Sequence, residues 1–178
     1  MRKLSMDELG RKSANEFKES EKFPLVLILD NVRSMMNTGS LFRTADAFLL
    51  EAIFLCGITA TPPHREIQKT ALGATESVNW KYFERAEDAI VELKKQGYVV
   101  YALEQAANSI SLQDFFPERG NKYALVLGNE VKGVGEDVLK VCNGCLEIPQ
   151  FGTKHSLNVA VTGGMVVWDF FSKLSRQV

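Results

Sequence analysis

The sequence has few cysteines and no long apolar run. Its 178 residues include three cysteines, Cys56, Cys142 and Cys145, and this small odd number does not build the disulfide framework of a secreted domain. The longest apolar stretches, such as LVLIL and YVVYAL, fall far short of the roughly 20 residues that a membrane-spanning helix needs. The N-terminal MRKLSMDELGR also lacks the apolar core of a signal peptide. We therefore expect a soluble, cytoplasmic protein without a membrane partner.

The sequence also lacks an excess of charge of either sign. Lys and Arg total 21 and Asp and Glu total 22, for a net charge of -1, so any basic patch for nucleic acid must be local. Neither G-x-G-x-x-G after the first strand nor G-x-x-x-x-G-K-[ST] is present, which disfavours nucleotide binding by a glycine-rich phosphate loop. A hydrophobic content of 46% fits one globular domain with a full core.

Apolar runs alternate with helical patterns from Pro24 onward. The strand-like runs are rich in Val, Leu, Ile and Tyr without strict polar alternation, which is typical of a parallel sheet covered on both faces. We therefore expect an α/β fold with a mostly parallel sheet and helices on both faces. Residues 1–23 are polar and of mixed charge, with Ser5 and Glu8 at capping-box spacing, and predict a helical, basic N-terminal arm before a domain at 24–178.

Loops that combine glycine with polar groups follow three of the expected strands. LVLIL precedes a segment in which Asn37 or Thr38 is expected to cap a helix that carries Arg43. YALVL precedes GNEVKGVG with its lone carboxylate, Glu130, and LEI precedes PQFGTKHSLNVAV, in which Ser156 and Asn158 are expected to open the last helix. Ligands of open α/β sheets bind at the carboxyl ends of strands. These residues alone indicate an α/β enzyme or a ligand-binding domain.

Two other chemistries fit the sequence less well. Cys142 and Cys145 have the spacing of a redox or metal pair, but no second pair is present and the only histidines are His64 and His155, so buried structural thiols and no metal are favoured. His155 beside Ser156 suggests a hydrolase triad, but neighbours in sequence rarely place nucleophile and base correctly, and no G-x-S-x-G is present.

Taken together, the three polar segments resemble the three motifs of the SpoU-TrmH family of RNA ribose 2'-O-methyltransferases in the SPOUT superfamily. NTGSLFRTADAF looks like the first motif, LVLGNEVKGV like the second and IPQFGTKHSLNVAV like the third, in the expected order. The resemblance covers about residues 24 to 172. It implies a C-terminal trefoil knot, a homodimer, S-adenosylmethionine as cofactor, and methylation of a ribose 2'-hydroxyl in structured RNA, with tRNA favoured over rRNA.

The resemblance also implies site residues, carried over by position. The matching catalytic positions are Arg43, Asn37, Glu130, Ser156 and Asn158. The implied cofactor contacts are Leu103, Glu104, Gly128, Asn129, Glu130, Ile148, Ser156 and Leu157. Arg43 matches the family's catalytic arginine, and we expect it to orient an RNA phosphate and stabilise developing negative charge, in its own subunit or across the dimer.

The sequence departs from the family pattern at two places beside the expected site. SerMetMet stands before Asn37 where many relatives have a proline-containing turn, and Gln150 stands where a methionine often follows Ile-Pro. Residues 1–23 are too few for the extra RNA-binding domain of some relatives, so we expect the arm and the dimer surface to select the substrate.

RNA contacts are expected from local basic residues, and dimer contacts from the last helix. The basic candidates are Arg2, Lys3, Arg11, Lys12, Arg33, Arg65, Lys69, Lys132 and Lys154. The apolar candidates for the dimer are Met165, Val166, Val167, Trp168, Phe170 and Phe171, unless they serve the core. The alternatives are a non-catalytic RNA-binding or assembly protein with the same knotted dimer, and a small-molecule α/β enzyme.

Overall fold

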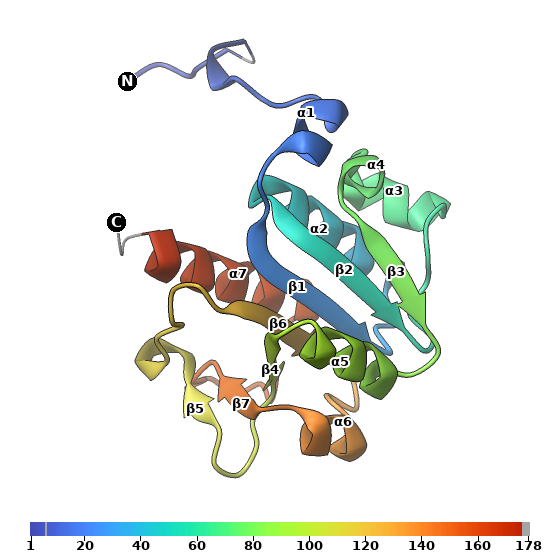
Figure 1. Ribbon diagram of the computed structural model, residues 1–178, viewed down its shortest axis with the longest axis vertical. Coiled ribbons are helices and arrows are strands. Elements are labelled where there is room, and N and C mark those ends of the chain that lie inside the picture. The colour runs from blue at the N-terminus through green and yellow to red at the C-terminus, as the bar shows by residue number, and fades with distance from the viewer. Residues whose placement is uncertain (6, 176–178) are drawn as a thin grey trace.

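The fold is an open parallel sheet between two layers of helices (Figure 1). The computed structural model describes residues 1–5 and 7–175. Within these residues seven strands form one sheet in the order β3-β2-β1-β6-β4-β7-β5. The strands are β1 (Phe23–Asp30), β2 (Leu50–Cys56), β3 (Trp80–Phe83), β4 (Tyr98–Leu103), β5 (Ile110–Ser111), β6 (Lys122–Leu127) and β7 (Gly144–Glu147). The helices are η1 (Asp7–Leu9), α1 (Ala14–Glu19), α2 (Met35–Ala47), α3 (Arg65–Ala71), α4 (Ala74–Ser77), α5 (Ala86–Lys95), η2 (Leu112–Asp114), α6 (Glu136–Val141) and α7 (Val159–Ser175).

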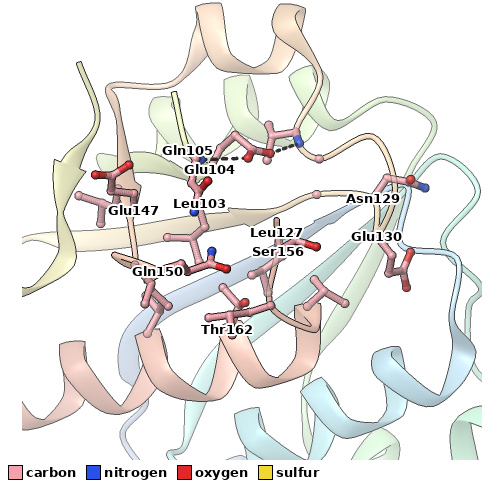
Figure 2. A pocket seen from close by; sticks show the side chains of 18 of the residues that line it. Leu103, Glu104, Gln105, Leu127, Asn129, Glu130, Glu147, Gln150, Ser156 and Thr162 are labelled. Carbon is pink, nitrogen blue, oxygen red and sulfur yellow. Dashed lines mark hydrogen bonds between the residues drawn. The ribbon is translucent and has the colours of Figure 1, made fainter. Parts of the chain in front are cut away.

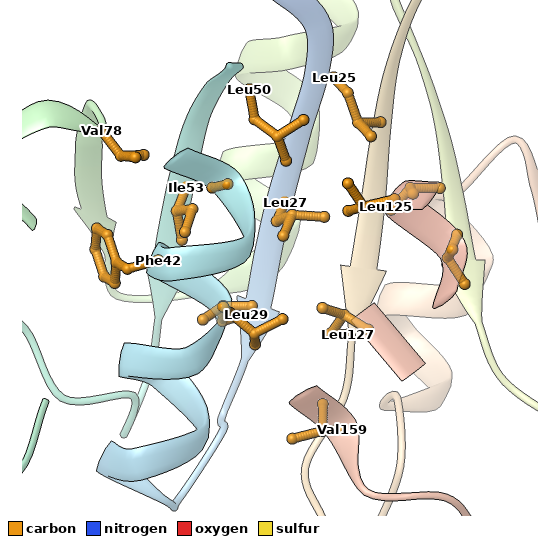
Figure 3. Close-up of a cluster of buried hydrophobic side chains, with 14 of the residues drawn as sticks. Leu25, Leu27, Leu29, Phe42, Leu50, Ile53, Val78, Leu125, Leu127 and Val159 are labelled. Atoms are coloured by element: carbon orange, nitrogen blue, oxygen red, sulfur yellow. The ribbon is translucent and has the colours of Figure 1, made fainter. Parts of the chain in front are cut away.

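Helices cover both faces of the sheet, which confirms the predicted α/β fold. Side chains from α2, α3, α4 and α7 pack on one face and those from α5 and α6 on the other (Figure 1). Alternate residues of β1 serve the two layers: Leu27 and Leu29 face α2 and α7 (Figure 3), and Val26 and Ile28 face α5. Because both faces are buried, the strand sequence is apolar throughout, as in LVLIL.

The parallel arrangement brings the three polar loops to one edge. β1 pairs with β6, β6 with β4, and β4 with β7, all in parallel. The segments that follow Asp30, Leu127 and Glu147 therefore leave the sheet at the same edge. Residues about 100 positions apart in sequence become neighbours there, as the hydrogen bond from Asn37 to Glu130 demonstrates.

β7 lies between β4 and β5, although it follows both in the chain. Residues 104–109 join β4 to β5 and must pass β7 to do so. Such an insertion of a later strand is what a threaded C-terminal region requires. The trefoil knot itself stays a prediction.

The first long helix begins earlier than its polar residues suggested. Ser34 is the N-cap of α2, and its hydroxyl accepts a hydrogen bond of 3.2 Å from the N–H of Asn37. The prediction that Asn37 or Thr38 caps this helix is therefore wrong. The reason is that the Asn37 side chain is engaged with Glu130 and Asn158, while the Thr38 hydroxyl donates back to the Ser34 carbonyl.

The last helix begins later than Ser156, at Val159, and the side chain of Asn158 caps its N-terminus. The Oδ1 atom of Asn158 accepts from the N–H groups of Ala160 and Val161, at 2.9 and 3.3 Å. Of the two residues expected to open α7, Asn158 does so, and Ser156 lies in the loop before the helix.

The apolar residues of α7 divide between core and surface. Val166, Val167 and Phe170 are fully buried in the chain's own core. These three residues therefore serve the core, which was the alternative to a dimer interface. Met165 and Trp168 remain 45% and 55% exposed, and Val161, one turn before Met165, is 52% exposed. No helix in the described part of the chain is long and apolar enough to cross a membrane.

The N-terminal arm carries two short helical turns. Ser13 and Glu16 form a complete capping box at the start of α1, and Ser5 and Glu8 pair in the same way at η1. Phe17 of α1 is 4% exposed and belongs to the core cluster. The arm is thus fixed to the sheet domain by one buried aromatic side chain, although the division at residue 23 stays a prediction.

Gly39 gives a stability test of this packing. A Cβ at Gly39 of α2 would overlap the carbonyl oxygen of Ile67 in α3, a backbone atom that cannot rotate away. We expect Gly39→Ala to destabilise the protein by about 1–3 kcal/mol despite the gain in helix propensity. Gly164→Ala is the matched control, because a Cβ at that position of α7 meets nothing within 4 Å. Equal thermal denaturation midpoints for the two variants would contradict this packing.

Candidate functional site

A cavity of about 450 Å³ opens where the polar loops leave the sheet (Figure 2). Its walls are the ends of β4, β6 and β7 with the loops that follow them, and the first turns of α7 contribute Thr162 and Val166. All the residues expected to contact a cofactor line it: Leu103, Glu104, Gly128, Asn129, Glu130, Ile148, Ser156 and Leu157. The volume is in the range usual for a small-molecule site.

The loop after β6 closes on itself through backbone contacts. The N–H of Asn129 donates to the carbonyl of Gly133, and the N–H of Gly133 donates back at 2.8 Å. A Cβ at Gly128 would overlap the backbone of Gly133 and Val134, so only glycine permits this close approach. The Asn129 amide holds the loop from within, donating to the Asn31 carbonyl and accepting from the N–H of Val131.

Glu104 braces this loop from β4. Its carboxylate accepts 2.9 Å hydrogen bonds from the N–H groups of Val134 and Gln105, drawn as dashed lines in Figure 2. A Cβ at Gly133, where φ is +68°, would overlap the same carboxylate. Sequence matching indicated Glu104 as a cofactor contact, and the structure adds that its carboxylate also fixes the wall of the cavity.

Glu130 joins the loop after β6 to the start of α2. Its carboxylate accepts from the N–H groups of Arg33 and Ser34, at 2.9 and 3.0 Å, and from Nδ2 of Asn37 at 3.0 Å. Partial burial alone would raise the pKa of Glu130, but these hydrogen bonds favour the charged form and hold the pKa below its ordinary value. The carboxylate is therefore ionised at neutral pH.

Asn37 extends this connection to the third loop. Its Oδ1 atom accepts a 3.2 Å hydrogen bond from Nδ2 of Asn158, the residue that caps α7. Glu130, Asn37 and Asn158 thus form one hydrogen-bonded chain across the three polar loops. Ser156, on the exposed loop before α7, lines the cavity together with Glu130.

The lining of the cavity carries more acidic than basic residues. Among the described residues that line it are three glutamates, Glu104, Glu130 and Glu147, and one lysine, Lys132, which favours a ligand with positive charge. Apolar side chains from β4, β6, β7 and α7 cover the remaining wall, including Leu127 and Val166. A flat apolar ring system with a cationic group suits such a site.

Arg43 does not line this cavity. It is exposed in α2 and lines a second cleft, between the N-terminal arm and α2 with α4. Asn37 and Arg43 lie roughly 9 Å apart along the helix axis, at about 1.5 Å per residue. Within one chain, the structure therefore brings together four of the five expected catalytic positions and leaves Arg43 apart.

The nine basic residues expected to contact RNA are all exposed. Lys132 lines the cavity, and Arg11 and Lys12 line the second cleft. Arg2 pairs with Glu8 and Lys69 with Glu66, in exposed ion pairs worth little to stability. Lys3, Arg33, Arg65 and Lys154 are spread over the surface.

The cysteines have the environment of structural thiols. All three are free, and burial raises the pKa of Cys56 and of Cys142 to about 12. The thiol of Cys145 donates a hydrogen bond to the carbonyl oxygen of Glu104, with the Sγ atom 3.2 Å from that oxygen. Neutral, partly buried thiols are poor nucleophiles and poor metal ligands.

Sequence reasoning missed two buried polar residues beside the site. The Thr59 hydroxyl, 3% exposed, donates to the Leu29 carbonyl and accepts from the N–H of Val32. Asp30, 4% exposed, ends β1, and burial raises its pKa although the Asn31 side chain donates to it. Thr59 lies in a loop without periodic pattern, so no sequence signal marked it.

Comparisons with known proteins agree on one family. The family model for the SpoU rRNA Methylase family matches residues 24–168. The 23S rRNA (guanosine-2'-O-)-methyltransferase RlmB of Neisseria meningitidis serogroup B is 31% identical over 144 residues, which are 81% of this chain and 56% of that protein. The chain therefore spans little more than half the length of this curated relative.

Solved structures give the same result. An AdoMet-bound rRNA methyltransferase from Sinorhizobium meliloti is 27% identical, with a TM-score of 0.79, covering 86% of this chain and 58% of the other. A structure described in terms of the 2-OH methylation of C/U34 on tRNA is 26% identical, with a TM-score of 0.74, covering 86% of this chain and 99% of the other.

Glu130→Gln tests the connection between the loops. A neutral amide loses the charge-assisted bonds and turns one NH2 group toward N–H donors, so we expect a loss of about 1–3 kcal/mol in stability. Hydrogen exchange at the amides of Arg33 and Ser34 should quicken. Exposed Glu136→Gln is the matched control.

The same variant predicts a pH dependence. Because the folded-state pKa of Glu130 is lowered, its stabilisation is present above the unfolded-state pKa, near 4.3, and is lost as pH falls through the folded-state value. Glu130→Gln should therefore approach the wild type in stability as the solution is acidified. A stability gap that stays constant down to acidic pH would show that the carboxylate charge is not what joins the loops.

Proposed function

The chain belongs to the SpoU rRNA methylase family, and from this premise we propose that it methylates a ribose 2'-hydroxyl in structured RNA with S-adenosylmethionine as the methyl donor. One observation carries the proposal: the Glu130–Asn37–Asn158 chain joins the three motif loops around a single cavity that all the expected cofactor contacts line.

The cavity fits this cofactor in shape and in charge. When bound, S-adenosylmethionine supplies a methyl group on a positively charged sulfur, which a ribose hydroxyl attacks. Leu127, Ile148 and Leu157 supply apolar surface for an adenine ring, and backbone groups beside Gly128 can approach its edge because that residue has no side chain. The carboxylates of Glu104 and Glu147 favour cationic groups.

Arg43 acts on the RNA rather than on the cofactor. Its guanidinium is a fixed positive charge with five N–H donors and no acceptor, so it holds a phosphate beside the reacting ribose and offsets negative charge on the attacking oxygen. The hydroxyl proton leaves to solvent. Asn37 and Asn158 keep the walls of the site in place through their mutual hydrogen bond.

We propose that a second copy of the chain completes the site. Arg43 lies outside the cavity of its own chain, and α7 presents Val161, Met165 and Trp168 as an exposed apolar stripe on the helix whose opposite side lines the cavity. This stripe is the surface that we propose to be buried in a homodimer, in which the Arg43 of one subunit acts at the cavity of the other.

Transfer RNA is the favoured substrate. The structure described with methylation of C/U34 on tRNA matches over 99% of its own length, which supports this preference. RlmB, named for 23S rRNA, is instead much longer than the matching region. A cytoplasmic location stays a prediction.

Methyl transfer tests the proposal directly. Labelled S-adenosylmethionine is incubated with total tRNA and, separately, with total rRNA, and nuclease digestion then locates resistant 2'-O-methylated nucleotides. We expect label in tRNA. Cofactor binding without label in either fraction would support the non-catalytic RNA-binding alternative, and turnover of a small molecule without RNA would support the small-molecule enzyme.

Arg43→Ala should lower the rate of methyl transfer by about 10²-fold or more, since it removes a charge that acts in the transition state. Cofactor affinity, measured by calorimetry, should stay close to the wild-type value because Arg43 lies outside the cavity. Arg43→Lys is the matched control and should retain part of the rate. An unchanged rate for Arg43→Ala would remove this residue from the mechanism.

Mixed dimers test whether Arg43 acts across the interface. Thr162→Trp fills the cavity from α7 and leaves Arg43 intact, so each variant alone should be inactive. Refolding an equimolar mixture should restore about a quarter of wild-type activity, because half of the dimers are mixed and each has one complete site. No recovery would place Arg43 in its own subunit's site.

A further inference from the structure

The second cleft differs from the cavity in its lining. It has a volume of about 610 Å³ and lies between the arm and the outer side of α2 and α4. Its lining includes the exposed apolar side chains of Leu9 and Leu72, above the buried Phe17, Ala71 and Ala74. The cleft therefore offers an apolar floor at the surface, which a flat, partly apolar group can cover.

The rim of this cleft is positively charged. Arg11 and Lys12 come from the arm and Arg43 from α2, and all three are exposed. No salt bridge found among residues 1–5 and 7–175 involves them, whereas Arg2 and Arg85 are paired with glutamates. Asp46 is the one carboxylate among the described residues that line the cleft, and the Ser77 hydroxyl donates to it at 2.6 Å.

The wall that bears Arg11 and Lys12 is held in place. Phe17 inserts into the core one turn after the capping box at Ser13, and Lys22 donates to the Phe17 carbonyl. The two cations therefore belong to a wall of the cleft that is anchored to the core directly after them. Fixed cations over an apolar floor match a nucleotide, which joins an anionic phosphate to a planar base.

We propose that this cleft binds a single-stranded segment of the substrate RNA, with phosphates on Arg11, Lys12 and Arg43 and a base against the apolar floor. The inference rests on the proposed function, and it identifies the surface along which the RNA strand continues beyond the reacting nucleotide. Arg43 is shared: it holds the phosphate nearest the reacting ribose, and Arg11 and Lys12 hold the phosphates that follow.

RNA binding without turnover tests the proposal. The probe is a fluorescein-labelled, unmodified tRNA transcript, and its affinity is measured by anisotropy at several KCl concentrations without cofactor. At about 50 mM KCl, Arg11→Ala/Lys12→Ala should bind about tenfold more weakly, and the slope of log affinity against log salt should fall by about 1.4, for two lost single-strand contacts. Lys94→Ala/Lys95→Ala, which removes the same charge from exposed α5 on the other face, should bind like the wild type.

The results differ between failure of the RNA-binding cleft and failure of the proposed methyltransferase function. If the wild type methylates RNA and both double variants bind with its affinity and salt slope, the cleft is not an RNA site and the proposed function stands. If the arm variant alone binds weakly and the wild type methylates no RNA, the cleft is supported and the proposed function fails. If the arm variant changes the monomer–dimer equilibrium in sedimentation and leaves RNA affinity unchanged, a second copy of the chain occupies the cleft and the proposal is overturned.

Discussion

The carboxylate of Glu130 is the point on which the geometry of the site depends. It receives two backbone N–H groups at the entrance to α2 and the amide of Asn37. The two backbone N–H groups have no acceptor within the helix, because they precede the first turn of α2. One anion thus sets the distance between two loops almost 100 residues apart in sequence, and Asn37 passes that constraint to α7 through Asn158.

The cavity wall depends on close backbone approach more than on side chains. Gly128 and Gly133 permit contacts that any Cβ would obstruct, and Glu104 and Asn129 use their polar groups to hold the loop. A wall made in this way presents N–H and C=O groups to a ligand at fixed positions. This is suited to recognising the edge of a planar ring, while the leucines around it cover the ring faces.

Helix α2 connects the two places where we propose that ligands bind. Its N-terminus takes part in the Glu130 network, and Arg43 lies further along at the cleft with the arm. Packing of Gly39 against α3 fixes the helix between these ends. A shift of α2 would therefore move both Asn37, which bonds Glu130 in the cavity wall, and Arg43 in the second cleft.

The sequence by itself determined the α/β class, the parallel sheet and the family, because apolar strands without alternation and three ordered motifs are local features. It also indicated which residues line the cavity. It did not determine that Ser34 caps α2, that Val166, Val167 and Phe170 belong to the core, or that Arg43 lies outside the cavity of its own chain. Only the tertiary structure decided these points, because each depends on partners distant in sequence. The side-chain amide of Asn37 forms hydrogen bonds with Glu130 and Asn158 instead of capping α2. In α7, Val167 is buried in the core whereas its neighbour Trp168 is exposed to solvent.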